Sequence, residues 1–314
     1  MHKFAPLQSC SEVTTAAHSD KLSRLDKKGN AMLTIISTPI GNLGDITYRA
    51  VQMLAAADII ACEDTRQTRK LLSLAAIKTS AQLWAYHDHN GASMRPKLIA
   101  ALTSGKTIAL VSDAGTPLIS DPGYKLVAAC HENNIPVTAA PGPTAPVMAL
   151  TLSGLPSDRF TFNGFVPQKQ KAARAALSEC RSSPMTQIWF ETPKRLAATL
   201  QMMAELYGNR HCVVARELTK LHETLHRGSL AELAASFSNG DALKGELVLV
   251  VEGAEKDSQQ MSLDDVRAQL EVVLQTASVR DAVQELELLS GLPRKQIYQM
   301  ALEIDKAKEI KTNR

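Results

Sequence analysis

The sequence predicts an α/β protein with two α/β domains and a small helical segment at its C-terminus. Short apolar runs alternate along the chain with amphipathic stretches, and these runs lack the polar alternation of a half-exposed strand. That combination is typical of mostly parallel sheets covered by helices on both faces. The length of 314 residues is more than one compact domain usually needs and is enough for two or three.

The first domain is predicted over residues 31–155. Leu33–Ser37 is an apolar, β-branched run and predicts the first strand, whereas Ile46–Ala56 repeats apolar residues at helical spacing. The same two patterns continue in order, with strands predicted at 58–62, 82–86, 107–111 and 136–139 and helices at 65–74, 121–133 and 144–152.

A second α/β domain is predicted over residues 156–254, because Pro156 and Pro167 bracket a change of pattern. Phe160–Phe165 predicts an aromatic strand, and a basic segment at 169–174 follows it as a loop or the start of a helix. Further strands are predicted at 187–190, 212–216 and 246–251, with a helix at 195–207 that ends near Gly208.

The two ends of the chain differ from these domains. Residues 1–30 are polar and contain no apolar core of a signal peptide, so we expect a loose tail. Residues 255–314 predict a charged linker and three short helices at 262–275, 279–290 and 294–304. Ser290–Pro293 resembles the turn of a helix-turn-helix, although a small helical cap fits this pattern equally well.

Composition excludes several classes of protein. A net charge of +3 argues against a polybasic, histone-like binder but not against an enzyme with local basic surfaces. The five cysteines are odd in number and contain no C-x-x-C pair, so we expect neither a disulfide framework nor a thiolate zinc site, and a cytoplasmic location. No apolar run approaches the ~20 residues of a membrane span. His87 and His89 suggest no third metal ligand, so we expect no metal.

Three loops of small residues follow predicted strands, at Thr38–Asp45, Asp113–Pro117 and Pro141–Ala145. Parallel sheets bind ligands at the carboxyl ends of their strands. Loops rich in glycine and proline present backbone N–H and C=O groups, which suit a purine edge or an amino-acid carboxylate. The Rossmann glycine fingerprint and the P-loop are both absent. Tight turns without a ligand remain the alternative, which is weaker for three loops than for one.

Two charged blocks also follow predicted strands, at Glu63–Arg66 and Arg216–Lys220. The first suits a substrate-contacting loop, and Asp64 or Thr65 equally suits the cap of the next helix. The second is either functional or a solvated connection whose ion pairs contribute little.

Together these blocks resemble one family, the ribosomal RNA small subunit methyltransferase I family of tetrapyrrole-methylase-like, class III S-adenosylmethionine-dependent methyltransferases. The resemblance spans about Leu33 to Gly253 and is carried by the segments 38–46, 63–66, 89–90, 111–123, 141–145, 153–155, 216–220 and 244–246. The long run Asp113-Ala-Gly-Thr-Pro-Leu-Ile-Ser-Asp-Pro-Gly123 is its most specific part. Asn90-Gly91 departs from the family, which commonly has an acid after the asparagine, so a role for an acid there is in doubt.

The resemblance implies two tetrapyrrole-methylase-type domains with S-adenosyl-L-methionine between them, and a homodimer. It implies methyl transfer to the ribose 2'-oxygen of a decoding-centre cytidine in 16S rRNA, free or in the 30S subunit. The residues that it implies for the cofactor are Pro39, Gly41, Asn42, Asp113, Ala114, Gly115, Thr116, Ile119, Ser120, Pro141, Gly142, Thr144, Ala145, Leu218 and Gly245.

A ribose hydroxyl is a poor nucleophile, so a base or a charge-stabilising group would assist its attack. Candidate catalytic residues are Glu63, Asp64, Arg66, Glu217 and Lys220, and candidate substrate-binding residues are His89, Asn90, Lys194, Arg195 and Arg216. Two alternatives stay open: another class III methyltransferase, acting on a tetrapyrrole or on diphthine, and a non-catalytic nucleic-acid-binding protein that uses the C-terminal helices.

Overall fold

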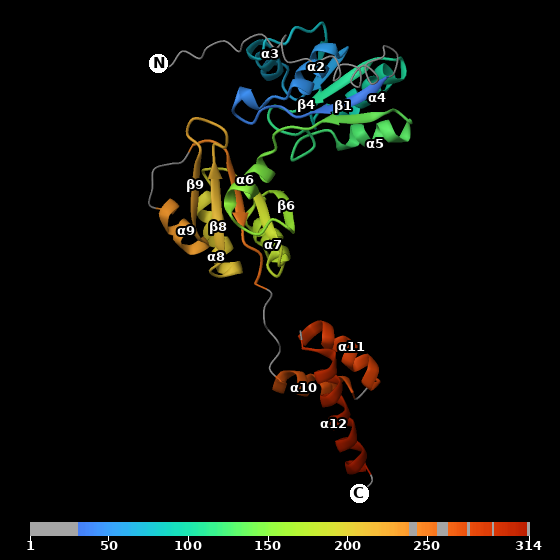
Figure 1. Cartoon of the computed structure of the whole chain (residues 1–314), viewed down its shortest axis with the longest axis vertical. Helices are drawn as coiled ribbons and strands as arrows, with labels where there is room; N and C mark the ends of the chain where they lie inside the picture. The colour runs from blue at the N-terminus through green and yellow to red at the C-terminus, as the bar shows by residue number, and fades with distance from the viewer. Residues whose placement is uncertain (1–30, 239–243, 256–262, 275–276, 291, 313–314) are drawn as a thin grey trace, which may run out of the picture. The chain divides into compact units, whose positions relative to one another are not determined.

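The structure is a computed structural model that describes residues 31–238, 244–255, 263–274, 277–290 and 292–312 (Figure 1). The predicted tail at 1–30 and nearly all of the predicted linker lie outside these residues. Internal contacts divide the chain into two compact units. Unit 1 contains the N-terminal part up to Leu152 together with Ala215–Leu225 and Gly245–Val248, and unit 2 contains the rest. The domain boundaries expected from the sequence stay predictions.

The sheet of unit 1 has five strands: β1 (Met32–Ile36), β2 (Ile59–Cys62), β3 (Gln82–Ala85), β4 (Thr107–Val111) and β5 (Val137–Ala140). Their order is β3-β2-β4-β1-β5, and every neighbouring pair is parallel. All five carboxyl ends therefore lie at one edge. The predicted α/β class and parallel sheet are confirmed.

Helices cover both faces of this sheet (Figure 1). On one face, α2 (Tyr48–Ala56) and α3 (Thr65–Leu74) contribute Leu54 and Leu72 to a core with Ile60. On the other, α4 (Gly91–Thr103) and α5 (Tyr124–Glu132) contribute Leu98 and Leu126 to a second core. Because both faces are packed, the central strands β2 and β4 are buried and largely apolar rather than alternating.

Two helices begin later than predicted. Thr47 caps α2 by accepting a hydrogen bond from the Ala50 amide, and a short 3-10 helix at Leu43–Asp45 precedes it. Gly123 has a φ of 140°, and a Cβ there would lie 2.9 Å from side-chain atoms of both Leu110 and Leu118. The chain therefore turns at Gly123 before α5 starts. Helix α6 (Ala145–Ser153) follows the loop after β5.

The second sheet has the order β6-β7-β10-β8-β9. Its strands are β6 (Phe160–Phe165), β7 (Thr186–Glu191), β8 (His211–Arg216), β9 (Thr224–Ser229) and β10 (Leu247–Val251). The chain segments between its strands form three helices: α7 (Gln170–Cys180), α8 (Leu196–Tyr207) and α9 (Leu230–Ser238). The sequence predicted neither α4 nor β9 and α9.

The three C-terminal helices expected from the sequence are present as α10 (Leu263–Val273), α11 (Val279–Ser290) and α12 (Arg294–Thr312). They enclose a core of their own that includes Leu270, Leu286 and Ile297. Ser290 ends α11 by accepting a hydrogen bond from the Leu292 amide at 3.2 Å.

Candidate functional site

Hydrogen bonds join the loops that follow β1, β4 and β5. Thr38 and Gly115 exchange backbone hydrogen bonds of 2.9 and 3.0 Å, which pair the first loop with the second. The Thr116 hydroxyl lies 2.9 Å from that of Ser37 and donates to the Pro143 carbonyl at 3.0 Å, which adds the third loop. The structure thus brings three stretches of predicted cofactor-binding residues to one edge of the sheet.

Two glycines allow these loops to pack closely against each other. A Cβ at Gly142 would lie 2.9 Å from the Ser37 Cβ, and Gly115 has a φ of 80°. The loops after β1 and β5 meet directly at Gly142. The sequence suggests that these glycines let a ligand approach, whereas the structure shows Gly142 and Gly115 where neighbouring loops contact each other.

The turn after Pro117 holds two non-glycine residues in the left-handed region. Leu118 has a φ of 75° and Ser120 a φ of 63°. Such residues persist only where the surroundings enforce them, and they cluster at ligand sites. Ile119, between them, is a large apolar residue with 38% of its surface exposed. This strained turn belongs to the motif that predicts cofactor contacts at Ile119 and Ser120.

The other predicted cofactor residues hold places in the same loops. Asn42 caps the 3-10 helix by accepting a hydrogen bond from the Gly44 amide at 3.0 Å. Ala114 accepts one from the Ser112 hydroxyl at 3.2 Å. Pro39 stands in the loop after β1, Pro141 and Thr144 stand in the loop after β5, and Ala145 begins α6.

Carboxylates gather beside these loops. Burial raises the pKa of Glu63, and the charges of Asp121, Asp113, Asp88 and Asp64 raise it further. Burial also raises the pKa values of Asp113 and Asp121. Because the described shifts come from mutual repulsion as well as burial, the cluster would gain stability from a cation bound near it.

Asp64 has a structural role within this group. Its side chain caps α3 by accepting from the Arg66 amide at 2.8 Å, and it pairs with the Arg66 guanidinium at 2.6 Å. The hydrogen bonds from Arg66 lower the pKa of Asp64 to about 2. Asp64 therefore stays ionised and is a weaker base than Glu63. The capping interpretation of this block is confirmed.

The shift of Asp121 predicts how stability depends on pH. Burial raises the pKa of Asp121, so its ionisation destabilises the fold as pH rises through that pKa. Asp121→Asn is expected to raise the free energy of unfolding at neutral pH, and the gain should vanish below about pH 4. Urea titrations at both pH values measure this.

Asp58 provides a control of opposite sign, because its hydrogen bonds with Thr107 lower its pKa. Asp58→Asn should reduce stability at neutral pH, and this loss should also shrink on acidification. A stability loss from Asp121→Asn at neutral pH would contradict the interpretation of the carboxylate cluster.

A second charged group forms around Lys220 in the same unit. Its ammonium donates to Glu217 at 2.8 Å and to Glu246 at 3.1 Å. Burial alone would lower the pKa of Lys220, but these hydrogen bonds outweigh it and raise the value. The same bond from Lys220 lowers the pKa of Glu217. Lys220 is thus held cationic and Glu217 anionic.

Two glycines lie directly against Lys220 and Glu217. A Cβ at Gly41 would lie 2.4 Å from the Lys220 side chain, so Lys220 lies directly against the loop after β1. Gly245 has a φ of 103°, and a Cβ there would overlap the Glu217 carboxyl group. Leu218, between Glu217 and the strained Thr219, is buried. The structure therefore joins Gly41, Glu217, Leu218, Lys220 and Gly245, all of which are predicted site residues.

Asn90 holds the turn after β3. Its side chain accepts from the His87 amide at 2.9 Å and donates to the Ala85 carbonyl at 3.0 Å. His89 is exposed, and its ring centroid lies 6.0 Å from that of His87. Asp88 in this turn raises the pKa of Glu63, so the turn borders the carboxylate cluster. A substrate role for His89 and Asn90 stays a prediction.

Arg195 lies in unit 2, where its guanidinium is engaged in several contacts. It pairs with the fully buried Glu191 at 2.6 Å and donates to the carbonyls of Val166 and Pro167 at 3.0 and 3.1 Å. Lys194 beside it is exposed, and Arg216 ends β8 in unit 1. Arg195 is therefore first a structural residue, and roles in substrate binding for all three stay predictions.

Two residues of the site were not predicted. Asp121 enters the carboxylate cluster from the turn before α5, and Glu246 shares the Lys220 ammonium. Both lie within segments that carry the family resemblance, and this is the sequence signal that points to them.

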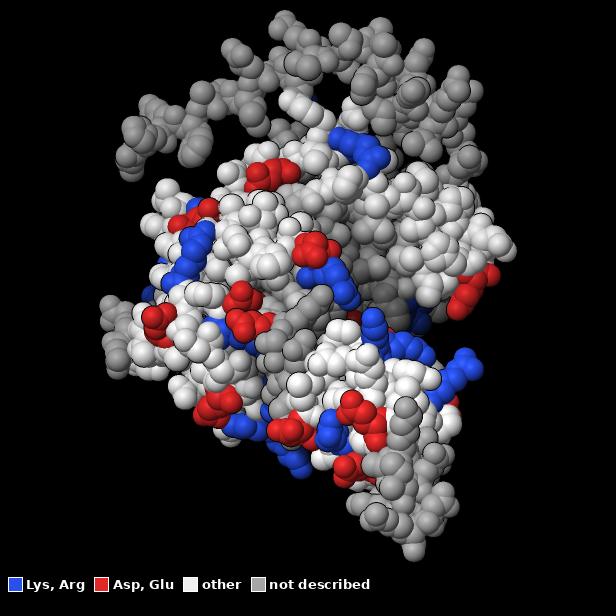
Figure 2. Space-filling view, turned by 60° about the horizontal axis from the view of Figure 1, so that its bottom comes forward, with Lys and Arg blue, Asp and Glu red and all other residues white. Residues whose placement is uncertain are grey.

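Figure 2 shows positive and negative side chains interspersed over the face in view.

Within the described residues, no group of three or more histidine, cysteine, aspartate or glutamate side chains is arranged to hold a metal ion. A search of the same residues for a helix with the length and hydropathy of a membrane span found no candidate.

Comparison with known proteins identifies the family. Residues 32–234 match the model of the Tetrapyrrole (Corrin/Porphyrin) Methylases, and residues 260–305 match that of the RsmI C-terminal HTH domain. A protein of Mesorhizobium japonicum named ribosomal RNA small subunit methyltransferase I is 44% identical over 274 residues, which cover 87% of this chain and 92% of its own. The chain belongs to this methyltransferase family.

Other members of the family are similar to this chain to the same extent. Proteins of the same name from Vibrio cholerae and Escherichia coli O157:H7 are each 44% identical over 277 residues, covering 96% and 94% of their own lengths and 88% and 86% of this chain. The family match extends from the N-terminal strands into the C-terminal helices. The recognition made from the sequence motifs is confirmed.

Solved structures share the fold at low identity. The methyltransferase CobJ superposes with a TM-score of 0.55 at 16% identity, covering 72% of this chain and 95% of its own. A diphthine synthase gives 0.54 at 14%, covering 71% and 90%. These likenesses confirm the tetrapyrrole-methylase fold.

Proposed function

We propose that this protein transfers a methyl group from S-adenosyl-L-methionine to the ribose 2'-oxygen of a cytidine in the decoding centre of 16S rRNA. The observation that carries the proposal is the 44% identity, over 87% of the chain, to a protein named ribosomal RNA small subunit methyltransferase I. The position 2'-O, the cytidine and the decoding centre come from the motif resemblance. A ribosomal substrate implies action in the cytoplasm, and the family resemblance implies a homodimer.

The chemistry of the residues present suits this cofactor. S-adenosyl-L-methionine carries a sulfonium and an ammonium group, and Glu63, Asp113 and Asp121 supply carboxylates whose mutual repulsion a cation would relieve. The joined loops after β1, β4 and β5 supply backbone groups for its adenine and carboxylate. The residues that would hold it are those predicted in these loops, with Leu218 and Gly245 beside them.

The cofactor brings a methyl group already activated by positive charge, so alignment supplies much of the rate enhancement. The protein's part is to hold the ribose hydroxyl in line and to accept its proton. Glu63 is the best base among the candidates, because its raised pKa gives it more affinity for a proton than Asp64 or Glu217 has. Lys220, held cationic, is suited to a substrate phosphate or a developing oxyanion.

Methyl transfer from radiolabelled S-adenosyl-L-methionine tests the proposal. The acceptors are 30S subunits, free 16S rRNA and short oligoribonucleotides, followed by nucleoside mass analysis. The expected product is a 2'-O-methylcytidine. Methylation at a base, or of a tetrapyrrole or a protein instead, would replace this function with that of another class III methyltransferase.

The non-catalytic alternative makes a different prediction. A protein that only binds nucleic acid through its C-terminal helices would show no heat of binding with S-adenosyl-L-methionine. The match of residues 32–234 to a methylase family favours the enzyme over this alternative.

A further inference from the structure

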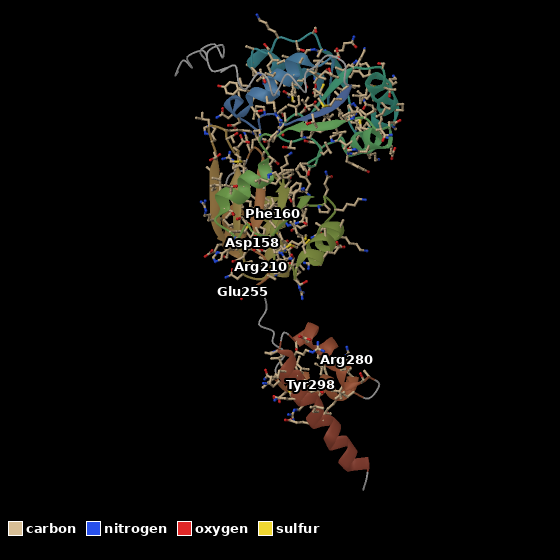
Figure 3. All side chains as sticks on the ribbon, turned by 45° about the vertical axis from the view of Figure 1, so that its right-hand side comes forward. Asp158, Phe160, Arg210, Glu255, Arg280 and Tyr298 are labelled. Atoms are coloured by element: carbon tan, nitrogen blue, oxygen red, sulfur yellow. The ribbon has the colours of Figure 1, made fainter. Side chains whose placement is uncertain are left out.

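Phenylalanines are concentrated at one edge of the second sheet. The chain has six, and four of them, Phe160, Phe162, Phe165 and Phe190, lie on the neighbouring strands β6 and β7. Strand β6 is the outer strand in the sheet order, and Figure 3 labels Phe160 at its start. Aromatic residues make up only 4% of the chain, so this cluster is unusual for the protein.

A bulge in β6 places these rings on one face. Phe162 pairs with Ile188 but Phe165 with Phe190, so three steps along β6 match two along β7. Without the extra residue, Phe165 would point to the other side of the sheet. Ring centroids of Phe162 and Phe165 each lie 5.1 Å from that of Phe190, which confirms the shared face.

The opposite face of these strands meets helices. Glu191 accepts a hydrogen bond from Thr199 of α8 at 2.6 Å, and the Gln187 side chain donates to the carbonyl of Cys180, the last residue of α7. The phenylalanine face is thus the one turned away from α7 and α8. On it, Phe160 is 42% exposed and Phe165 is 54% exposed.

Hydrogen bonds fix the backbone that follows Phe165. Arg195 donates to the carbonyls of the next two residues, Val166 and Pro167, and is itself fixed by Glu191. The Val166 amide donates to the Phe190 carbonyl at 3.1 Å. An exposed ring on so constrained a backbone loses little conformational entropy when it binds a partner.

Positively charged side chains follow both strands at the end where Phe165 lies. Exposed Lys169 and Lys171 follow β6, and exposed Lys194 follows β7, its parallel neighbour. The Arg195 guanidinium already neutralises Glu191 in the same turn. An exposed aromatic ring, with exposed lysines following the same strand ends, suits single-stranded nucleic acid, in which a base stacks on the ring and phosphates meet the lysines. A second copy of the chain would bring the same positive charge against itself.

We propose that Phe165 stacks against an unpaired nucleobase of the RNA substrate while Lys169 and Lys194 contact the adjoining phosphates. Phe160, Phe162 and Phe190 complete the surface, which we name the phenylalanine edge. Arg195 acts as a positioning residue for it. The inference rests on the proposed function for the identity of the RNA.

Substitutions at Phe165 separate stacking from simple apolar contact. The probes are a fluorescein-labelled, single-stranded oligoribonucleotide of about 12 nucleotides for Kd and 30S subunits for KM. Phe165→Ala and Phe165→Leu should each raise both constants about 5- to 150-fold, and Phe165→Trp should restore them. The affinity for S-adenosyl-L-methionine and kcat at saturating RNA should change little.

Leu74→Ala is the matched control, because Leu74 is 60% exposed at the end of α3 in unit 1. It should leave both constants unchanged. In a Trp84→Phe background, the fluorescence of buried Trp189 during thermal unfolding shows whether the Phe165 variants keep their fold.

Three results would overturn the inference. Wild-type RNA affinity in Phe165→Ala would remove the ring from recognition, and wild-type affinity in Phe165→Leu would exclude stacking. A change of sedimentation from dimer to monomer with unchanged RNA affinity would make the edge an interface between copies. If the wild type methylates no RNA, the proposed function fails, while oligoribonucleotide binding still decides the role of Phe165.

Discussion

Arg195→Met is expected to cost about 3–5 kcal/mol of unfolding free energy, because it leaves the Glu191 carboxylate buried without its cation. Glu191 has no exposed side-chain surface, and its remaining hydrogen bonds come from the Thr199 hydroxyl and from Thr192. Neutral donors offset the burial of a charge less than a guanidinium does. Denaturant unfolding in a Trp84→Phe background, where Trp189 is the only remaining tryptophan, reports on the second sheet.

Arg174→Met is the control for this loss. Arg174 pairs with Glu205, but both side chains are about half exposed, so its removal should cost at most about 1 kcal/mol. Combining Arg195→Met with Glu191→Gln should recover much of the stability, because no unpaired charge remains. Equal effects of Arg195→Met and Arg174→Met would show that the Glu191 pair is not a supporting element of this fold.

Glu63→Gln is expected to lower kcat by about 100- to 10,000-fold if Glu63 accepts the proton from the ribose hydroxyl. Glutamine keeps the shape and the hydrogen-bonding capacity but cannot take up the proton. Wild-type kcat should fall as pH drops through the raised pKa of Glu63, and the variant should lack this limb of the profile. Calorimetry should show a much smaller change in affinity for S-adenosyl-L-methionine.

Asp64→Asn is the comparison for the base. It removes an ionised capping residue with a pKa of about 2, so it should affect kcat less than Glu63→Gln and should not remove the acidic limb. Wild-type kcat in Glu63→Gln would assign proton acceptance to solvent or to another group. It would leave Glu63 as one charge of the carboxylate cluster.

The parts of the fold that the sequence predicts well are those with one dominant local pattern. Strand β4 and helix α3 have the predicted bounds, because a buried apolar run and a capped amphipathic repeat determine them. Helix α4 was not predicted, since Pro96 lies inside it and its buried face rests on the spaced residues Leu98, Ala101 and Leu102. Strand β9 contains Arg227 and Gly228, which obscure its pattern.

The site shows the same limit at the level of side chains. Local sequence places Glu63 and Asp64 next to each other, but only tertiary structure buries Glu63 near Asp121 and pairs Asp64 with Arg66. Their different pKa values therefore could not be predicted. Likewise, a basic residue after a strand suggests a phosphate contact, whereas Arg195 is committed to Glu191. Spacing along the chain does not show which charge is already paired.

The division of the chain has a consequence for protein synthesis. Segments 215–225 and 245–248 belong to unit 1, and Lys220 lies against Gly41. Chains emerge from the ribosome N-terminus first. The loop after β1 can therefore contact Lys220 only after most of the polypeptide has been made. A fragment that stops at residue 155 would lack Lys220 and its contact with Gly41, so we expect the N-terminal half alone to have an incomplete loop after β1.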